Sequence, residues 1–470
     1  MRTYEFPMQR TYGEPVGQPN PPLSVAERAA IAAIALGTLM LLAAFLGAPL
    51  GNTWLGPVAT FGLLVAGGIG WFWLRYQRTT PGVKHNSLFF SGAMSRGAIG
   101  WGLGILITGF YVLLYWFPQH IEGGIRLVDP VAFALSGQAA NQWFLYGFLY
   151  TLAMTVFGAR MLMKYRHNRY QRIRTISVVF FQLGFAFLIP HILKSLGEPE
   201  FYFTYFWPLK PDYLFPDSID WLTGSAGRLG LFMVSWGAVM TFIATPVLTY
   251  FYGKRWYCSW VCGCGGLAET LGDPWRHLSD KSSRAWKVER WMIHSVLVLI
   301  VVTTALLWIN DAKGGAVFGG LSQSLKKHYG FFIGMVFSGV AGVGFYPILG
   351  SRVWCRFGCP QAAILGLFQR FLSRFRITVN GQQCMSCGNC STHCEMGIDV
   401  RSYAQRGENI IRASCVGCGV CAAVCPRGVL KLENGRTHTD RYPGANAPGR
   451  ALLESLGLKK RTQGRGAYWS

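Results

Sequence analysis

Charged residues are scarce in this 470-residue chain, at 14% of all positions. A soluble protein carries roughly 25% charged residues, so this scarcity excludes an ordinary soluble domain over most of the length. Hydrophobic residues make up 51% of the chain, aromatic residues 15%, and the mean hydropathy is +0.27. Such a composition is typical of a protein that crosses a lipid bilayer several times.

Acidic residues are rarer still, with 21 Asp and Glu against 44 Lys and Arg, which gives a net charge of +23. We expect no nucleic-acid partner, because no basic face with interleaved aromatic residues stands out. The basic residues instead flank apolar runs. The sequence also lacks a recognisable signal peptide, a Ser-His-Asp set and a flavin motif. Its G-x-x-G-x-G run, 339–344, lies inside an apolar segment, where dinucleotide binding is not expected.

Eight apolar runs predict an all-α polytopic membrane protein. Each run of about 20 residues is long enough to cross a hydrocarbon core roughly 30 Å thick. The second and eighth runs are rich in glycine, which permits close packing between spanning helices. The predicted spans are 29–49, 56–74, 97–116, 141–163, 175–193, 229–252, 291–310 and 331–350.

The basic residues concentrate in alternate connecting loops. Loop 164–174 holds five Lys or Arg and loop 253–290 holds seven, whereas loop 117–140 holds one. Loop 194–228 has three basic residues against five acidic ones. By the positive-inside rule, both termini and every cysteine-bearing segment are predicted to face the cytoplasm from the cytoplasmic (inner) membrane. Thiols in that compartment are kept reduced, which disfavours structural disulfides.

The clearest motif is a run of four cysteines that occurs twice near the C-terminus. The spacing C-x2-C-x2-C-x3-C appears at 384–394 and again at 415–425, with Pro426 after the second run. It is the spacing of bacterial two-cluster ferredoxins, in which the fourth cysteine of each run ligates the other cluster. Zinc sites favour separate C-x2-C pairs instead. We therefore expect two [4Fe–4S] clusters, one on Cys384, Cys387, Cys390 and Cys425, and one on Cys415, Cys418, Cys421 and Cys394.

The residues around these cysteines predict a small α+β domain of the 2[4Fe–4S] ferredoxin type over 376–435. The β-prone segments FRITVNG and GVLKLENG bracket the cysteines. Gly388, Gly417 and Gly419 are expected to turn backbone amides toward the cluster sulfurs. Glu395 stands where a proline often follows the fourth cysteine, and we expect it to loosen that turn while leaving the ligand intact.

Two further cysteine pairs follow apolar runs, at Cys258-x3-Cys262 and Cys355-x3-Cys359. Because residues at i and i+4 share one helix face, the pairs are predicted to meet as a four-thiolate site at the membrane surface. Such a site could hold a metal ion or a third cluster, or act as a redox dithiol pair. Cys264 could replace one ligand. The alternative is that these cysteines are small apolar packing residues.

Arginines next to the two pairs are expected to lower the pKa of the thiols and to favour thiolates. The arginines are Arg255, Arg352 and Arg356.

Together these elements resemble the membrane-bound polyferredoxin family of NapH-, NosR- and CcoG-like 4Fe–4S proteins. The resemblance rests on the two ferredoxin motifs and on the segments YCSWVC and VWCRFGCPQ, and it covers about residues 229–430. The pair that ends at Cys359 is followed by Pro360, as in the family, whereas Gly263 follows the first pair.

The resemblance implies an iron–sulfur protein that relays electrons between the quinone pool, or a membrane partner, and redox proteins. It would act in the lipid bilayer as a subunit of a quinol dehydrogenase or oxidoreductase complex. One alternative is a CcoG-like copper reductase or assembly factor for a respiratory oxidase, in which the cysteine pairs bind copper. Another is a redox-sensing membrane regulator.

Haem is not expected, because His191 and His294 lie near opposite ends of their spans and cannot share one iron across the bilayer. A haem held by His191 with His120 or His328 is the remaining alternative.

The predicted organisation has five parts, ordered by composition and motif. They are a cytoplasmic segment 1–28, spans one to five with the outer loop over 29–228, spans six to eight with both cysteine pairs over 229–375, the ferredoxin-like domain 376–435, and a basic flexible tail 436–470.

Overall fold

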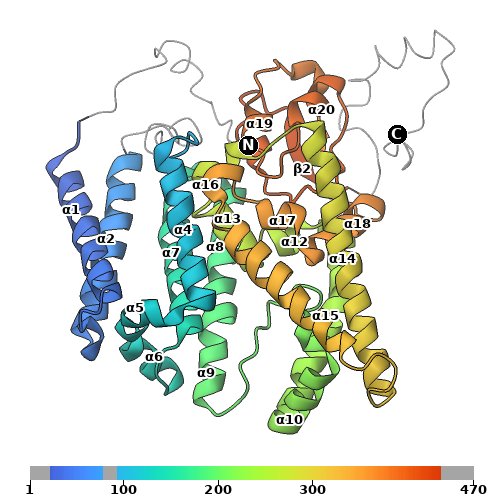
Figure 1. Cartoon of the computed structure of the whole chain (residues 1–470). Helices are drawn as coiled ribbons and strands as arrows, with labels where there is room; N and C mark the ends of the chain where they lie inside the picture. The colour runs from blue at the N-terminus through green and yellow to red at the C-terminus, as the bar shows by residue number, and fades with distance from the viewer. Residues whose placement is uncertain (1–21, 78–92, 436–470) are drawn as a thin grey trace.

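The computed structural model describes residues 22–77 and 93–435, and most of them are helical (Figure 1). Within these residues, seven helices are long and apolar enough to cross a membrane. They agree with the first seven predicted spans. Their bounds are α1 Val25–Phe45, α2 Leu55–Gln77, α4 Ala98–Trp116, α7 Gln142–Lys164, Arg169–Ser195, Pro216–Tyr252 and α14 Ser283–Ala312.

Two of these seven helices are interrupted by a turn of π-helix. The first consists of α8 (Arg169–Leu183), η5 (Gly184–Leu188) and α9 (Ile189–Ser195). The second consists of α10 (Pro216–Val239), η7 (Met240–Ala244) and α11 (Thr245–Tyr252). In both, a proline stands at the start of the last segment and supplies no amide hydrogen to the helix ladder.

The eighth predicted run, 331–350, does not form one continuous spanning helix. Its first half is π-helix η9 (Gly330–Ala341), which continues α15 (Leu321–Tyr329), and a turn then leads into α16 (Tyr346–Leu349). Gly339 and Gly344 pack directly against Tyr115 and Thr108 of α4, where a Cβ atom would collide. Glycine thus allows close contact with α4 here but weakens the regular helix.

Polar side chains mark where several long helices begin. Ser24 starts α1 with a capping box in which Glu27 returns the hydrogen bond. Asn141, Asn168 and Ser282 each accept a hydrogen bond from the first turn of α7, α8 and α14. Between these ends the backbone hydrogen bonds are internal, which is what a helix in hydrocarbon requires.

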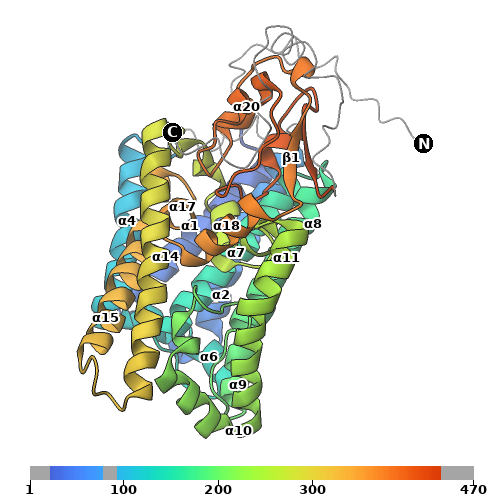
Figure 2. The same cartoon turned by 90° about the vertical axis from the view of Figure 1, so that its right-hand side faces the viewer.

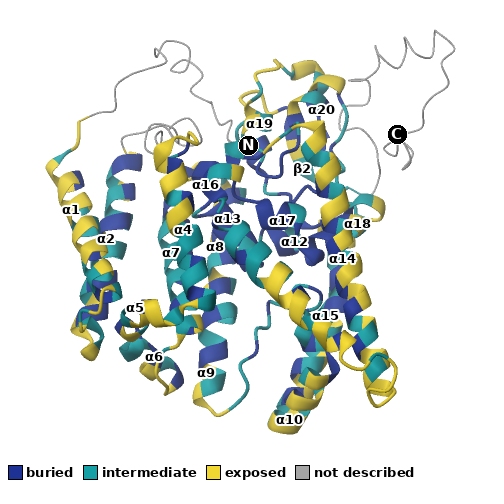
Figure 3. Cartoon of the chain, in the orientation of Figure 1, coloured by how far each residue is buried: buried dark blue, intermediate teal, exposed yellow. Residues whose placement is uncertain are grey.

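Exposed residues lie along the outer faces of the long helices (Figure 3), and many of them are large and apolar. Leu39 on α1, Leu106 on α4 and Val298 on α14 are each more than 60% exposed. Soluble proteins rarely leave such wide apolar surfaces in water. The faces therefore fit contact with lipid.

One end of the helix bundle is closed by short helices. They are η2 Leu50–Asn52, η4 Pro118–Ile121, α5 Glu122–Leu127, α6 Asp129–Ser136 and η6 Pro211–Leu214.

The other end carries the cysteine pairs and a further set of short helices (Figures 1 and 2). These short helices come after α11, which ends at Tyr252, and after η9, which ends at Ala341. The members of the set are α12 Arg255–Cys258, α13 Gly263–Glu269, η8 Asp273–Leu278, α16 Tyr346–Leu349, α17 Val353–Phe357 and α18 Pro360–Phe371.

The ferredoxin-like domain sits on this same end. Strands β1 (Arg376–Val379) and β2 (Leu430–Glu433) pair antiparallel, with Ile377 opposite Leu432 and Val379 opposite Leu430. The two predicted β segments are thus confirmed. Between the strands lie η10 Gly381–Gln383, α19 Asn389–Thr392, α20 Val400–Arg406 and α21 Val420–Ala423.

The domain and the helix bundle share one hydrophobic core. Phe206 and Tyr257 from the bundle pack in the same buried cluster as Phe375, Met396 and Val416 from the domain. A linker between independent domains would expose such residues. The domain is therefore seated on the bundle by apolar contact.

A network of buried charges lies beside this shared core. The Asp273 carboxylate forms ion pairs with Arg160 at 2.8 Å, with Lys164 at 2.6 Å and with Arg276 at 2.8 Å, measured from nitrogen to oxygen. All four residues are fully buried. Burial alone would raise the pKa of Asp273, but the three cations outweigh it and hold that pKa well below its usual range. The resulting stabilisation is present above the ordinary pKa of an aspartate and is lost as the pH falls below it.

We predict that Asp273→Asn lowers the free energy of unfolding by about 3–5 kcal/mol, because three buried cations lose their anion. The thermal-unfolding midpoint of the solubilised protein measures the effect. Asp217→Asn is the matched control, since Asp217 pairs with Lys326 at 2.7 Å while its side chain is 50% exposed; it should cost about 1 kcal/mol or less. Equal losses in the two variants would contradict a special role for Asp273.

Candidate iron–sulfur site

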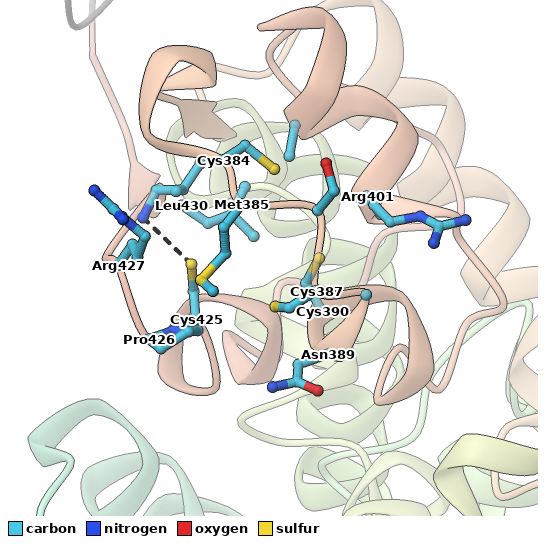
Figure 4. A pocket seen from close by; sticks show the side chains of 14 residues that line it. Cys384, Met385, Cys387, Asn389, Cys390, Arg401, Cys425, Pro426, Arg427 and Leu430 are labelled. Carbon is cyan, nitrogen blue, oxygen red and sulfur yellow. Dashed lines mark hydrogen bonds between the residues drawn. The ribbon is translucent and has the colours of Figure 1, made fainter. Parts of the chain in front are cut away.

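Two pockets in the ferredoxin-like domain are each lined by four cysteines. Pocket 1 is lined by Cys384, Cys387, Cys390 and Cys425, whose sulfur atoms surround one space (Figure 4). Pocket 2 is lined by Cys394, Cys415, Cys418 and Cys421. In each pocket three cysteines come from one run and the fourth comes from the other run.

The two runs have matching backbone conformations. Gly388 and Gly419 occupy equivalent places, with φ of 80° and 76°, and each precedes a short helix. Gly417 has φ of 63°, and its equivalent Ser386 has φ of 59°. Residues other than glycine rarely take this left-handed conformation. Ser386 therefore holds a strained position that the loop around pocket 1 requires.

The fourth cysteine of each run accepts a backbone hydrogen bond. Ile398 donates its N–H to Cys394 Sγ at 3.4 Å, and Val429 donates to Cys425 Sγ at 3.4 Å. Amide hydrogen bonds to sulfur favour the thiolate form that binds iron.

The pockets differ in exposure. Cys387 in pocket 1 is exposed and Met385 beside it is 49% exposed. In pocket 2, Cys415 and Cys421 are each 7% exposed. Pocket 1 therefore faces outward, and pocket 2 lies within the domain.

The loop around pocket 2 is hydrogen-bonded to the helix bundle. Tyr170 of α8 donates to Gly417 O at 2.8 Å, and Gln171 donates to Cys418 O at 2.8 Å. Ser259, next to α12, donates to Val416 O at 2.8 Å, and Gln369 of α18 donates to Cys415 O at 2.7 Å. Pocket 2 thus adjoins the segments that bear the cysteine pairs.

Each cysteine pair crosses a junction between two helices. Cys258 ends α12, and Cys262 stands at the N-cap of α13. Cys355 lies in α17, and Cys359 caps α18, where its Sγ accepts from Ala362 N at 3.4 Å. The prediction that each pair shares the face of one helix is wrong. Pro360 and the turn before it end the first helix of the second pair.

The fold nevertheless brings the two pairs together. All four cysteines are 5–6% exposed, and Cys258 and Cys262 interact electrostatically with both Cys355 and Cys359. Cys264 lies next to Cys262, and a hydrogen bond between the two thiols lowers the pKa of Cys262. We call Cys258, Cys262, Cys355 and Cys359 the four-cysteine site.

The expected general lowering of the thiol pKa values is not found. Burial raises the pKa of Cys258, Cys355 and Cys359. At Cys258 and Cys355, nearby cations only partly oppose this rise. Of the three arginines, Arg352 alone reaches a sulfur, with Nη1 3.6 Å from Cys355 Sγ. Arg255 instead stacks on Phe375, at 4.7 Å from the ring centre.

The third arginine, Arg356, pairs with Glu289 at 2.7 Å and donates a hydrogen bond to the carbonyl oxygen of Asp280 at 2.7 Å. Proximity in sequence thus did not predict which guanidinium groups face the thiols.

No three His, Cys, Asp or Glu side chains within 22–77 and 93–435 are placed to hold a single metal ion. An iron–sulfur cube spreads its thiolates over four iron atoms, so its ligands stand farther apart than those of one ion. The donors in pocket 1 fit a cube, since four thiols meet there and no carboxylate lines the wall.

The histidines considered for haem occupy separate settings. His191 packs between the rings of Phe144 and Phe187, at 4.8 and 5.0 Å. His120 lies against Phe117, and His328 bonds to Ser324 within its own helix. None of these contacts joins one histidine to another.

Sequence reasoning missed the buried residues between pocket 2 and the four-cysteine site. Glu395 is fully buried and faces Arg352 at 3.0 Å and Arg276 at 3.7 Å. Arg352 also pairs with Glu269 at 2.6 Å. One sequence signal could have pointed to these residues. Ionisable residues beside long apolar runs usually mark a functional or structural site.

Two family models match this chain. One, described as a 4Fe–4S dicluster domain, matches residues 383–430. The other, described as a 4Fe–4S binding domain, matches 234–288 and 331–378. These last two segments contain the two cysteine pairs. The chain thus carries 4Fe–4S ferredoxin-type domains.

Curated relatives share parts of the sequence. YccM of Escherichia coli (strain K12), provisionally named an electron transport protein, is 27% identical over 36% of this chain and 49% of its own length. MauN of Paracoccus denitrificans (strain Pd 1222), a methylamine utilization ferredoxin-type protein, is 28% identical over 30% of this chain and 48% of its own. The chain therefore spans about half the length of these relatives.

An uncharacterized protein of Methanocaldococcus jannaschii is 25% identical over 34% of this chain and 59% of its own length. No solved structure matches the chain. The domains and the relatives agree with the predicted resemblance to membrane polyferredoxins.

Proposed function

We propose that this chain, whose ferredoxin-type domains are those of a membrane polyferredoxin-like family, relays electrons between a membrane carrier and redox proteins. The observation that carries the proposal is the grouping of eight cysteines into two pockets, each with three ligands from one run and one from the other. A [4Fe–4S] cluster bound there would accept and release one electron at a time.

The residues of each pocket fit that role. Cys384, Cys387, Cys390 and Cys425 would hold one cluster in pocket 1, and the cysteines of pocket 2 would hold the other. The backbone amides of Ile398 and Val429 would stabilise the thiolate charge of Cys394 and Cys425.

The order of the sites supports a relay. Pocket 1 is exposed through Cys387, where a redox protein can approach. Pocket 2 is buried and bonded to α8 and α18. The four-cysteine site lies beyond it, next to the apolar helices. Electron tunnelling weakens steeply with distance, so closely spaced centres are what a path from water to membrane requires.

A third centre at the four-cysteine site belongs to this proposal. Its support is the 4Fe–4S binding domain model, which matches the segments around both cysteine pairs. Thiolates also suit Cu(I), so copper at this site is the competing assignment.

The membrane side of the relay would be the quinone pool or a partner subunit in the cytoplasmic membrane. The support is the placement of the ferredoxin-like domain, the cysteine pairs and the basic loop 164–174 at one end of the bundle (Figure 1).

The grouping of the ligands gives a sharp prediction. Cys425→Ala should remove the same cluster signal as Cys384→Ala, although Cys425 belongs to the second run. Cys394→Ala should match Cys418→Ala. Each variant should lose about four irons per chain. Electron paramagnetic resonance of the reduced, anaerobically purified proteins, with iron analysis, measures this.

If Cys425→Ala instead matched Cys418→Ala, each run would bind its own cluster and the assignment would be wrong. Ser373→Ala is a suitable control, because Ser373 lines neither pocket; its spectra should be unchanged.

Orientation can be tested with reporter fusions in a bacterial host. Green fluorescent protein joined after residue 435 should fluoresce, because it folds in the cytoplasm. Alkaline phosphatase inserted at Gly197, in the turn after α9, should be active, because that enzyme needs the outer side. The reverse pattern would refute the proposed orientation.

A further inference from the structure

Glu395 directly follows a cysteine of pocket 2 and is fully buried. It lines that pocket and has 0% exposed surface. Removing a carboxylate from water costs several kcal/mol unless a cation compensates it. A loosened turn, which the sequence predicted for this position, does not require a buried charge. The burial of Glu395 therefore needs a specific partner.

Arg352 is that partner, and it also reaches the four-cysteine site. Its Nη2 lies 3.0 Å from Glu395 Oε1. Its Nη1 lies 3.6 Å from Cys355 Sγ and 3.3 Å from the carbonyl oxygen of Cys258. Arg352 is itself 1% exposed. The Glu395–Arg352 pair thus makes a line of atomic contacts from pocket 2 to both cysteine pairs.

We propose that the Glu395–Arg352 ion pair couples the centre in pocket 2 to the centre at the four-cysteine site. This inference rests on the proposed function. With iron–sulfur clusters bound at both sites, one electron would leave the reduced centre at one end and reduce the oxidised centre at the other. No bond forms or breaks, and no proton moves. Contacting atoms sustain electron tunnelling better than a gap does, and arginine keeps its charge throughout.

The surrounding charges hold the pair in place. Glu269 binds Arg352 at 2.6 Å and also pairs with Arg174, while Arg276 lies 3.7 Å from Glu395. Cations outnumber carboxylates in this buried network by five to three. They are Arg160, Lys164, Arg174, Arg276 and Arg352 against Asp273, Glu269 and Glu395.

An excess of buried cations is unfavourable by itself, but it suits a position between two anionic, thiolate-ligated centres. The network therefore gives a second reason, independent of the contact line, to place negative centres on both of its sides.

Three variants of the full chain in lipid nanodiscs test the coupling. Glu395→Gln removes the negative charge at nearly constant shape, and Arg352→Lys keeps the positive charge but loses the planar fork. Glu289→Gln is the matched control. It breaks the Arg356–Glu289 pair of 2.7 Å, which is also buried and in which Arg356 directly follows Cys355, but neither of its residues lines pocket 2.

Two measurements are made on anaerobic protein. Redox titration followed by electron paramagnetic resonance gives the potential of each centre. Freeze-quenching after photoreduction gives the rate at which electrons redistribute between the centres.

Glu395→Gln should favour reduction of the pocket 2 centre by about tenfold, which is ~59 mV for one electron, because a nearby negative charge is gone. Arg352→Lys should slow the redistribution by about tenfold with the potentials little changed. Glu289→Gln should stay within about twofold of the unmodified chain in both measurements.

Unchanged potentials and rates in both Glu395→Gln and Arg352→Lys would overturn the coupling. Loss of iron in both variants would assign the pair a structural role and would overturn it as well. If Glu395→Gln alone loses iron, Arg352→Lys decides, since Arg352 does not line pocket 2.

The unmodified chain separates this inference from the proposed function. About eight irons, with none at the four-cysteine site, would overturn the coupling and leave the two-cluster relay standing. A chain without iron would overturn the proposed function itself.

Discussion

The fold depends on charges that are buried where the ferredoxin-like domain meets the helix bundle. Glu395 comes from the domain, whereas Arg276 and Arg352 come from the short helices at the end of the bundle. A buried ion pair adds little net stability compared with a pair of apolar side chains in the same place. A misplaced domain, however, would leave buried charges without partners, and each unpaired charge would cost several kcal/mol. Apolar packing of Tyr257 and Met396 supplies attraction, and the charges fix the position. The pockets can then lie close to the apolar helices without a flexible linker.

Much of the architecture could be predicted because it depends on local patterns. Apolar length located the seven long apolar helices that the described residues form. Cysteine spacing gave the assignment of eight cysteines to two clusters, and the structure places these cysteines around two pockets. The prediction of a spanning helix at the eighth run was wrong, because the length of an apolar run does not show whether the helix is regular. Gly339 and Gly344 press against α4, and the run becomes π-helix and turn. A hydropathy profile accepts such glycines within a spanning helix, but it contains no information about their contacts with α4.

The parts that could not be predicted depend on contacts between distant segments. Sequence proximity suggested three arginines near the thiols, yet Arg255 and Arg356 find Phe375 and Glu289 instead. Only Arg352 faces Cys355. Glu395 was expected only to loosen the turn after Cys394. Its partner Arg352 lies 43 positions earlier in the chain, so no local pattern connects the two residues. Such partners become visible only when the chain is folded.

The central claim is that the cysteine-lined pockets hold iron–sulfur cubes. Mössbauer spectroscopy of anaerobic protein grown on 57Fe tests it most directly, because it identifies every iron environment at once. The account predicts that the iron is present as [4Fe–4S]²⁺ centres, with about eight irons in the ferredoxin-like domain and about four at the four-cysteine site. A spectrum of isolated iron ions, or a preparation without iron, would contradict it.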